Sequence, residues 1–348
     1  PFSSSDRREY SGYHAHNDLM SVLDGLRYAY REIRDNYDDR FWWRNRFFHR
    51  LIAPFHLTVY PTRSAAIDVP EADWDTLIVL DACRTDLFEE RADVDRYDEY
   101  RTVTSRGSAT QEWVRQNFAG RSFGDMVYVT ANPFVSREAG DAFHEIYEPW
   151  VSEFDEETRT VLPEQTTETA IRAHRDHPDK RIVVHYMQPH HPFVTAPELQ
   201  FHGWQIDDFE GWKEKQEETG LKDDVKKGRP HTPWDALYMG LVSKEAVWDA
   251  YGDNLTRTLD SVSELLDEIE GRTVLTSDHG NMLGERTFPL PLQVYGHPSG
   301  IRNSELVDVP WAVVETGQRR TVSDDGTATQ SEHDQEMVQD RLEDLGYV

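Results

Sequence analysis

Short runs of apolar, mostly β-branched residues constrain the fold of this chain more than any other feature. The first is Thr76-Leu77-Ile78-Val79-Leu80, which is continuous rather than alternating with polar residues. Such a run is typical of a strand that is buried on both faces of a sheet. Similar runs lie at 126–129, 181–186, 273–276 and 309–314.

Helical patterns separate these runs, at 109–118, 164–177 and 244–270. Strands that alternate with helices predict an α/β fold, with a mostly parallel central sheet and helices on both faces. A chain of 348 residues has room for one large domain or two small ones. Apolar spacing over 17–38 predicts an N-terminal helix, so we expect a helical extension over 1–70 and the main domain over 71–348. The polar stretch 203–232 is typical of an insertion or lid.

The segment 41–52 is aromatic and basic, although the chain as a whole is acidic. One interpretation is an accessory helix that packs on the main domain with its Arg side chains in solvent. The other is an interfacial segment, because Trp and Phe beside Arg suit an anionic membrane surface. The sequence leaves both interpretations open.

The charge balance excludes some partners. There are 65 Asp and Glu against 37 Lys and Arg, and the net charge of −28 would repel nucleic-acid phosphates, so we expect no nucleic-acid partner. Acidic composition with scarce Lys predicts a salt-adapted proteome of the haloarchaeal kind. The single cysteine, Cys83, excludes an intramolecular disulfide and a Cys-based zinc site. Without an apolar run of 18 residues or a signal-like N-terminus, we expect a cytoplasmic protein, peripheral at a membrane if 41–52 is interfacial.

Asp and His residues follow three of the predicted strands. Asp81 comes after the first run, Asp278-His279 after 273–276, and a His cluster that includes His190 after 181–184. Ligands bind at the carboxyl ends of strands in parallel α/β sheets, so these side chains are expected to converge. Carboxylates and imidazoles favour Mn²⁺ or Zn²⁺, while Mg²⁺ and Ca²⁺ stay open. His297 is far enough along the chain to return over the same site.

These motifs together resemble the alkaline phosphatase superfamily, in particular its sulfatase-like branch with lipoteichoic acid synthases and phosphoethanolamine transferases. The resemblance rests on DACR (81–84), TSDHGNMLGE (276–285), QPHHPF (188–193) and GH (296–297), and it covers about 75–315. It implies one divalent metal ion bound by Asp81, Asp278, His279 and the nucleophile. It also implies that His190 contacts the substrate; we expect His297 to do so from the other side.

The nucleophile is expected within 102–113, where a turn of small residues leads into a helix. In the look-alikes it is a Thr shortly before an acidic-aromatic pair. Aligning Glu112-Trp113 on that pair places Ser108 at the nucleophile position, where it would also be a metal ligand. The alternative is that Ser108 or Ser105 only caps the helix and Thr110 attacks. Arg84 and Arg106 are candidate phosphate contacts, with an ordinary surface role as the alternative.

The function implied is a metal-dependent hydrolase or transferase of phosphate esters that forms a covalent Ser intermediate. Sulfate esters are disfavoured, because the C-x-P-S-R-like stretch that yields formylglycine in sulfatases is absent at 104–112. The substrate could be linked to a glycan or a lipid. The alternative from another class is a non-catalytic protein of the same fold that binds an anionic glycan or lipid surface, mainly through 41–52.

Overall fold

The computed structural model describes residues 27, 30–34, 37, 43, 46–59, 65–201, 230, 232–327, 337–338 and 341–342. Most of the predicted helix at 17–38 and nearly all of the predicted insertion at 203–232 lie outside these residues. Within the described parts of the chain, every helix is too short or too polar to cross a bilayer.

Seven of the strands in the described residues form one sheet, in the order β2-β9-β6-β1-β5-β3-β4. The pairs within β6-β1-β5-β3-β4 are parallel, while β9 is antiparallel to both of its neighbours. The strands of this sheet are β1 (Thr76–Asp81), β2 (Glu99–Thr104), β3 (Phe123–Thr130), β4 (Phe143–Tyr147), β5 (Arg181–Pro189), β6 (Gly271–Thr276) and β9 (Asp308–Thr316). The predicted α/β fold with a mostly parallel sheet is confirmed.

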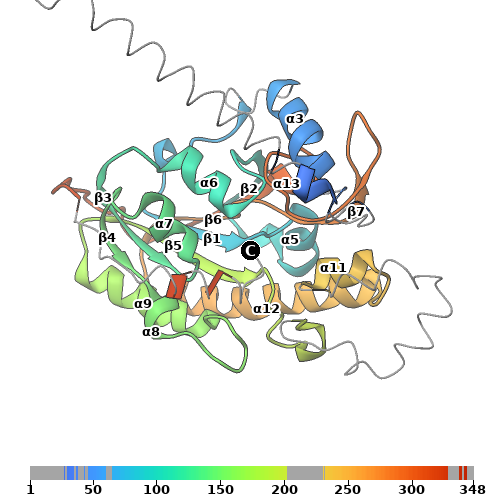
Figure 1. Cartoon of the computed structure of the whole chain (residues 1–348). Helices are drawn as coiled ribbons and strands as arrows, with labels where there is room; N and C mark the ends of the chain where they lie inside the picture. The colour runs from blue at the N-terminus through green and yellow to red at the C-terminus, as the bar shows by residue number, and fades with distance from the viewer. Residues whose placement is uncertain are drawn as a thin grey trace, which may run out of the picture.

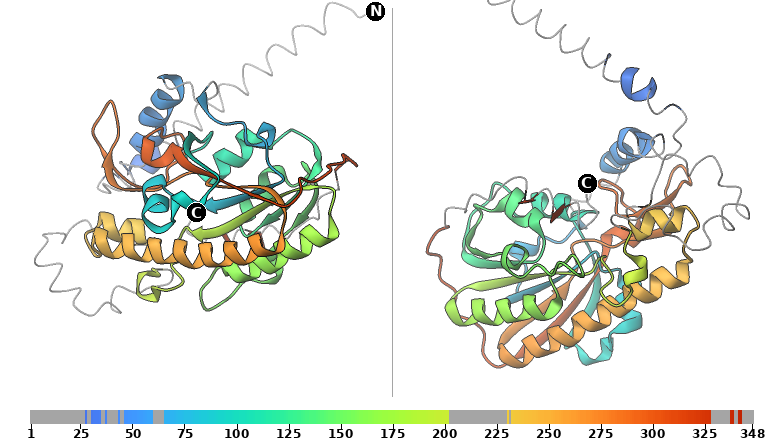
Figure 2. Two further views of the ribbon diagram at one scale, coloured as in Figure 1. Left: turned by 180° about the vertical axis from the view of Figure 1, so that it is seen from behind. Right: turned by 60° about the horizontal axis from the view of Figure 1, so that its bottom comes forward.

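Helices cover both faces of this sheet, with α9 and α12 side by side on one face and α6 toward the other (Figures 1 and 2). Central strand β1 shows why, because its side chains alternate between two apolar clusters. Ile78 and Leu80 pack with α9 and α12, whereas Leu77 and Val79 pack with Trp113 of α6. The longer helices are α5 (Thr85–Arg91), α6 (Thr110–Asn117), α7 (Pro133–Ala139), α9 (Pro163–Asp176), α11 (Pro233–Tyr238) and α12 (Lys244–Glu268).

A second, smaller sheet pairs β7 (Met282–Arg286) with β8 (Gln293–Gly296) as an antiparallel hairpin. The predicted 41–52 segment ends in a π-helical turn, η1 (Phe48–Ile52), that continues into α3 (Ala53–Val59). Ile52 and Ala53 pack against Met282 and Val294 of the hairpin. The other short helices are η2 (Val69–Glu71), η3 (Val94–Arg96), α8 (Pro149–Ser152), η4 (Pro197–Leu199) and α13 (Ser304–Val307).

Candidate metal and catalytic centre

Two fully buried carboxylates lie at the carboxyl ends of adjacent parallel strands. Asp81 is the last residue of β1, and Asp278 follows β6 by two residues. Both side chains are 0% exposed. Burial, together with the negative charge of Asp278, raises the pKa of Asp81 above its usual value. Two buried carboxylates of this kind are stabilised by a shared cation or proton.

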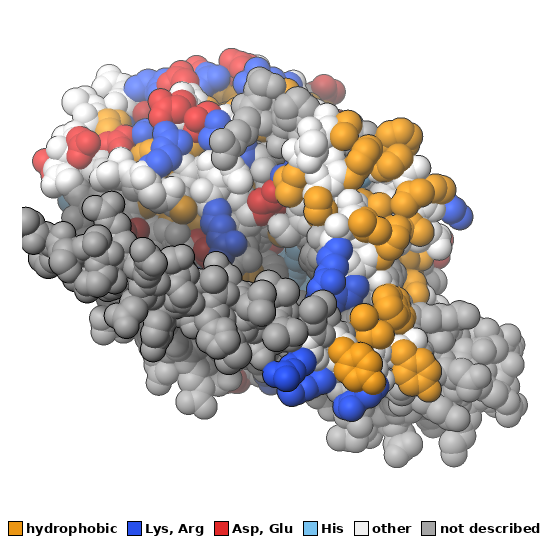
Figure 3. All heavy atoms as spheres, turned by 45° about the horizontal axis from the view of Figure 1, so that its top comes forward, with side chains coloured by type: hydrophobic (Ala, Val, Ile, Leu, Met, Phe, Trp, Pro, Cys, Tyr) orange, Lys and Arg blue, Asp and Glu red, His pale blue; other side chains and the backbone are white. Residues whose placement is uncertain are grey.

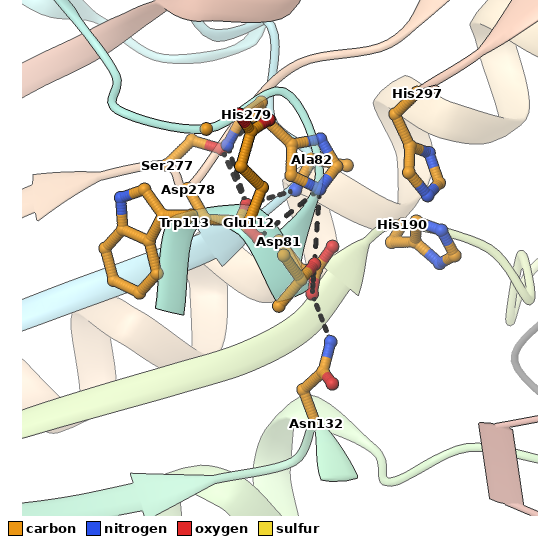
Figure 4. A network of polar contacts seen from close by, with 12 residues as sticks. Asp81, Ala82, Glu112, Trp113, Asn132, His190, Ser277, Asp278, His279 and His297 are labelled. Carbon is orange, nitrogen blue, oxygen red and sulfur yellow. Dashed lines mark hydrogen bonds and ion pairs between the residues drawn. The ribbon is translucent and has the colours of Figure 1, made fainter. Parts of the chain in front are cut away.

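The turn after each strand fixes these carboxylates. Oδ1 of Asp278 accepts hydrogen bonds from the backbone N–H groups of Ala82 and His279, both at 2.9 Å. Ala82 has a φ of 58°, in the left-handed region, and this directs its N–H toward Asp278. Oδ2 of Asp81 accepts from Nδ2 of Asn132 at 2.7 Å, so the loop after β3 also contributes (Figure 4).

His185 joins the two carboxylates from the interior of β5. Its Nε2 lies 3.4 Å from Oδ2 of Asp81 and 3.9 Å from Oδ2 of Asp278, while its Nδ1 lies 3.0 Å from the Tyr128 hydroxyl. One ligand atom from each of the three residues lies within 4.8 Å of the others. Among the described residues, His185 Nε2 and Asp278 Oδ2 have no hydrogen-bond partner despite being buried. This Asp-His-Asp group could therefore bind a divalent metal ion.

His279 also faces this group. Its Nδ1 is 2.8 Å from the carbonyl oxygen of Gly280, which fits an N–H donating there and leaves the lone pair on Nε2. Nε2 lies 3.4 Å from Oδ2 of Asp278. Of the four side chains expected to bind the metal, the structure brings Asp81 and Asp278 into one group and places His279 beside Asp278, while Ser108 lies elsewhere. The structure adds His185, whose only sequence signal was a titratable residue inside an apolar run.

The two candidate nucleophiles have different surroundings. The Thr110 hydroxyl lies 3.2 Å from Nε2 of His279 and 3.4 Å from Oδ2 of Asp81, at the first residue of α6. The Ser108 hydroxyl oxygen instead lies 3.0 Å from the Pro298 carbonyl oxygen and 3.2 Å from Glu112 Oε2, and its single proton is donated to one of these two acceptors. The structure therefore brings Thr110, and not Ser108, to the carboxylates. Ser108 lies away from the carboxylates of Asp81 and Asp278 because its backbone N–H donates to the carboxylate of Glu112, four residues later.

His190 and His297 lie side by side and face the centre from different loops (Figure 4). Their ring centroids are 5.0 Å apart, and the ring of His297 is 4.7 Å from that of His279. His190 Nδ1 is 2.5 Å from the His191 carbonyl, and His297 Nδ1 is 2.8 Å from Oδ1 of Asn281. Burial is the main cause that lowers the pKa of both imidazoles well below the usual value, with neighbouring histidines adding to it. Neutral rings bound through Nδ1–H present Nε2 as a proton acceptor.

The two candidate phosphate contacts are engaged elsewhere. The Arg84 guanidinium donates to Asp86 at 2.6 Å, to Glu285 at 3.0 Å and to the Asn281 carbonyl at 2.9 Å. Arg106 forms an ion pair with Asp68 at 2.9 Å. The buried Arg84 therefore connects α5 to the loop after β6. The contacts of Arg84 and of Arg106 fit a structural role for both residues.

The sequence matches no protein-family model and no curated protein. Solved structures similar to this chain include phosphoethanolamine transferases, a lipoteichoic acid synthase and sulfatases, the kinds of protein that the motifs resemble. The soluble domain of lipooligosaccharide phosphoethanolamine transferase A from Neisseria meningitidis is 13% identical, with 68% of this chain and 75% of that one covered and a TM-score of 0.42.

Two further structures are similar to the same degree. The C-terminal periplasmic domain of EcEptC from Escherichia coli, in complex with Zn, is 13% identical, with 69% of this chain and 72% of that one covered and a TM-score of 0.42. The lipoteichoic acid synthase LtaP from Listeria monocytogenes is 12% identical, with 77% and 73% covered and a TM-score of 0.38. The likeness is distant, and the function of this chain has to be argued from its own residues.

Proposed function

We propose that this protein is a metal-dependent phosphoester hydrolase or transferase that works through a covalent phosphothreonine at Thr110. The observation that carries the proposal is the position of the Thr110 hydroxyl, between His279 and Asp81 and beside the buried Asp-His-Asp group. A nucleophile at the start of α6 also has the positive end of the helix dipole beside it.

The proposed metal ligands are Asp81, His185 and Asp278, whose ligand atoms lie within 4.8 Å of one another, with His279 and the Thr110 oxygen beside them. Carboxylates and imidazole nitrogens suit Zn²⁺ or Mn²⁺. A bound ion of this kind would lower the pKa of the Thr110 hydroxyl and offset charge on the phosphoryl oxygens. The orphaned Oδ2 of Asp278 and Nε2 of His185 are the chain's own support for this cation.

In the first half-reaction, Thr110 Oγ1 bonds to phosphorus and the bond from phosphorus to the leaving oxygen breaks. The Thr110 proton has to leave, and the leaving oxygen has to gain one. We assign the transfer of this proton to His190 and His297, because their rings face the centre and that of His297 lies beside His279. In the second half-reaction, the oxygen of water or of an acceptor hydroxyl bonds to phosphorus, the bond from phosphorus to Thr110 Oγ1 breaks, and the attacking group's proton passes to Thr110 Oγ1. Which acceptor is used decides between hydrolysis and transfer.

The test compares Thr110→Ala with Ser108→Ala on p-nitrophenyl phosphate mono- and diesters, with Mn²⁺ or Zn²⁺ added. Thr110→Ala should lose turnover by several orders of magnitude and lose the phosphoryl adduct in intact-mass spectra, yet keep its metal content. Ser108→Ala should still form the adduct. Thr85→Ala is a matched control, because Thr85 is also the first residue of a helix, with its hydroxyl bound to the Asp308 carbonyl at 2.9 Å.

If the phosphoryl adduct persists in Thr110→Ala and disappears in Ser108→Ala, the nucleophile is Ser108. Release of p-nitrophenol from the sulfate ester at a rate equal to that from the phosphate would contradict the preference for phosphorus. An intact, metal-loaded protein that turns over none of these esters would favour the non-catalytic alternative. Cytoplasmic localisation and the salt-adapted origin stay predictions from the sequence.

A further inference from the structure

Exposed apolar side chains gather on one surface beside the catalytic centre. The loop between β7 and β8 exposes Phe288 by 64%, Leu290 by 44% and Leu292 by 37%. Next to it, η1 and α3 expose Leu51, Leu57 and Val59 by about half. We name these six residues the hairpin–α3 surface. The loop projects from the molecule in Figure 1 and in the left view of Figure 2, with α3 near it.

Hydrogen bonds connect the loop between β7 and β8 to α3 and close the loop on itself. His56 of α3 lies with Nε2 2.5 Å from the Phe288 carbonyl and accepts a hydrogen bond from the Arg302 backbone at Nδ1, at 2.8 Å. Within the loop, the N–H of Thr287 donates to the Leu292 carbonyl at 2.9 Å. These contacts fix the backbone of the loop at Thr287, Phe288 and Leu292, and the side chains of Phe288, Leu290 and Leu292 are exposed.

The charge around this surface differs from that of the rest of the chain. Residues 40–67 and 286–304 contain no Asp or Glu, in a protein with 65 of them. Arg50 and Arg286 are both exposed in these segments. Figure 3 shows hydrophobic side chains collected along one side of a face with Lys and Arg beside them, while Asp and Glu concentrate on the opposite side. The surface is therefore apolar with a cationic margin.

We propose that the hairpin–α3 surface docks on an anionic lipid bilayer. Apolar side chains that project from an anchored loop can enter the boundary between head groups and acyl chains, and flanking Arg side chains pair with lipid phosphates there. The absence of carboxylates from both segments lowers the repulsion locally, in a protein whose net charge is −28. The surface thus extends the predicted interfacial segment 41–52 to a second element, the hairpin loop.

Docking would place the catalytic centre close to the membrane. The strand β8 begins one residue after Leu292 and leads directly into His297, whose ring contacts that of His279. Lipid binding itself does not depend on the proposed function.

The experiment is flotation of the full chain with vesicles of phosphatidylcholine alone or mixed with phosphatidylglycerol, in a buffer where circular dichroism shows the protein folded. The unmodified protein should float with the anionic vesicles. Phe288→Ser/Leu290→Ser should weaken this partition by about tenfold or more, because two projecting apolar groups are lost. Val151→Ser/Val322→Ser is the matched control, since Val151 and Val322 are exposed by 40% and 39%. That control should bind as the unmodified protein does.

Equal flotation of the unmodified protein and the Phe288/Leu290 variant would overturn the proposal. So would equal flotation of the unmodified protein with vesicles that contain phosphatidylglycerol and with vesicles that lack it. A concentration-dependent dimer that the same variant abolishes, without vesicle binding, would assign the surface to a second copy of the chain instead. Thr110→Ala should float like the unmodified protein. Failure of the proposed chemistry and failure of lipid docking therefore give separate results.

Discussion

Removing the carboxylate of Glu112 should destabilise the protein strongly. Its oxygens accept hydrogen bonds from the backbone N–H groups of Ser108 at 3.0 Å and Gly300 at 3.1 Å, and they form an ion pair with Arg302. The Arg302 side chain is only 3% exposed. Glu112→Ala leaves this buried cation and the two N–H groups without their acceptor, which costs about 3–5 kcal/mol. That is a large part of the roughly 5–15 kcal/mol that stabilises a typical protein.

Equilibrium urea unfolding, followed by Trp fluorescence, measures this cost. A control is Asp93→Ala, because the ion pair of Asp93 with Arg96 is exposed by 62% and 85% and should contribute less than about 1 kcal/mol. The double variant Glu112→Leu/Arg302→Met removes both charges, so it should lose less stability than the two single alanine variants together. A Glu112→Ala protein within about 1 kcal/mol of the unmodified one would refute the reasoning.

The same pair predicts a pH dependence. Burial alone would raise the pKa of Glu112, but hydrogen bonding and charge attraction from Arg302 outweigh it and hold the pKa below its usual value. A carboxylate with a lowered pKa in the folded state stabilises the protein above its unfolded pKa, about 4.3 for Glu. This contribution is lost as the pH falls through the folded pKa. The gap in stability between the unmodified protein and Glu112→Ala should therefore narrow below about pH 4.

Two further predictions concern the metal. A chelator should lower the melting temperature of the unmodified protein, measured by differential scanning calorimetry. It should leave that of Asp278→Asn nearly unchanged, because the variant lacks a charged metal ligand. Equal shifts of the two melting temperatures would contradict the proposed metal site. His185→Phe should weaken metal affinity by about 10–100-fold in chelator competition, whether His185 binds the ion directly or orients the carboxylates. An unchanged affinity would limit His185 to packing.

The central strands could be predicted because their burial leaves a plain pattern. In β1 all six residues are buried, and the predicted run at 76–80 misses only Asp81. Strands β2 and β4 were not predicted, and both lie at the edges of the sheet. The six residues of β2, EYRTVT, are exposed or half-buried, since an edge strand does not need two apolar faces. Runs of apolar residues therefore predict the central strands of such a sheet better than its edge strands.

The convergence of Asp81, Asp278 and His279 follows from parallel strands, because neighbouring carboxyl ends meet at one edge. His185 does not follow from that rule. It lies opposite Val79 within the paired part of β5, where a buried His is more often a core residue. What distinguishes it is the Tyr128 hydroxyl on Nδ1, a contact across two strands that sequence order cannot reveal.

The choice between Ser108 and Thr110 shows why a nucleophile is hard to place by alignment of a short loop. Ala109, between them, is extended, with φ −154° and ψ 151°. Side chains two residues apart in extended backbone point to the same side. An alignment that is wrong by two residues therefore still places a hydroxyl on the correct side of the chain, but at the wrong residue. Glu112 decides the outcome, because it accepts from the N–H of Ser108 and lies 3.2 Å from the Ser108 hydroxyl oxygen. Those contacts hold Ser108 against the loop at 298–302 and leave the first residue of α6, Thr110, facing the carboxylates.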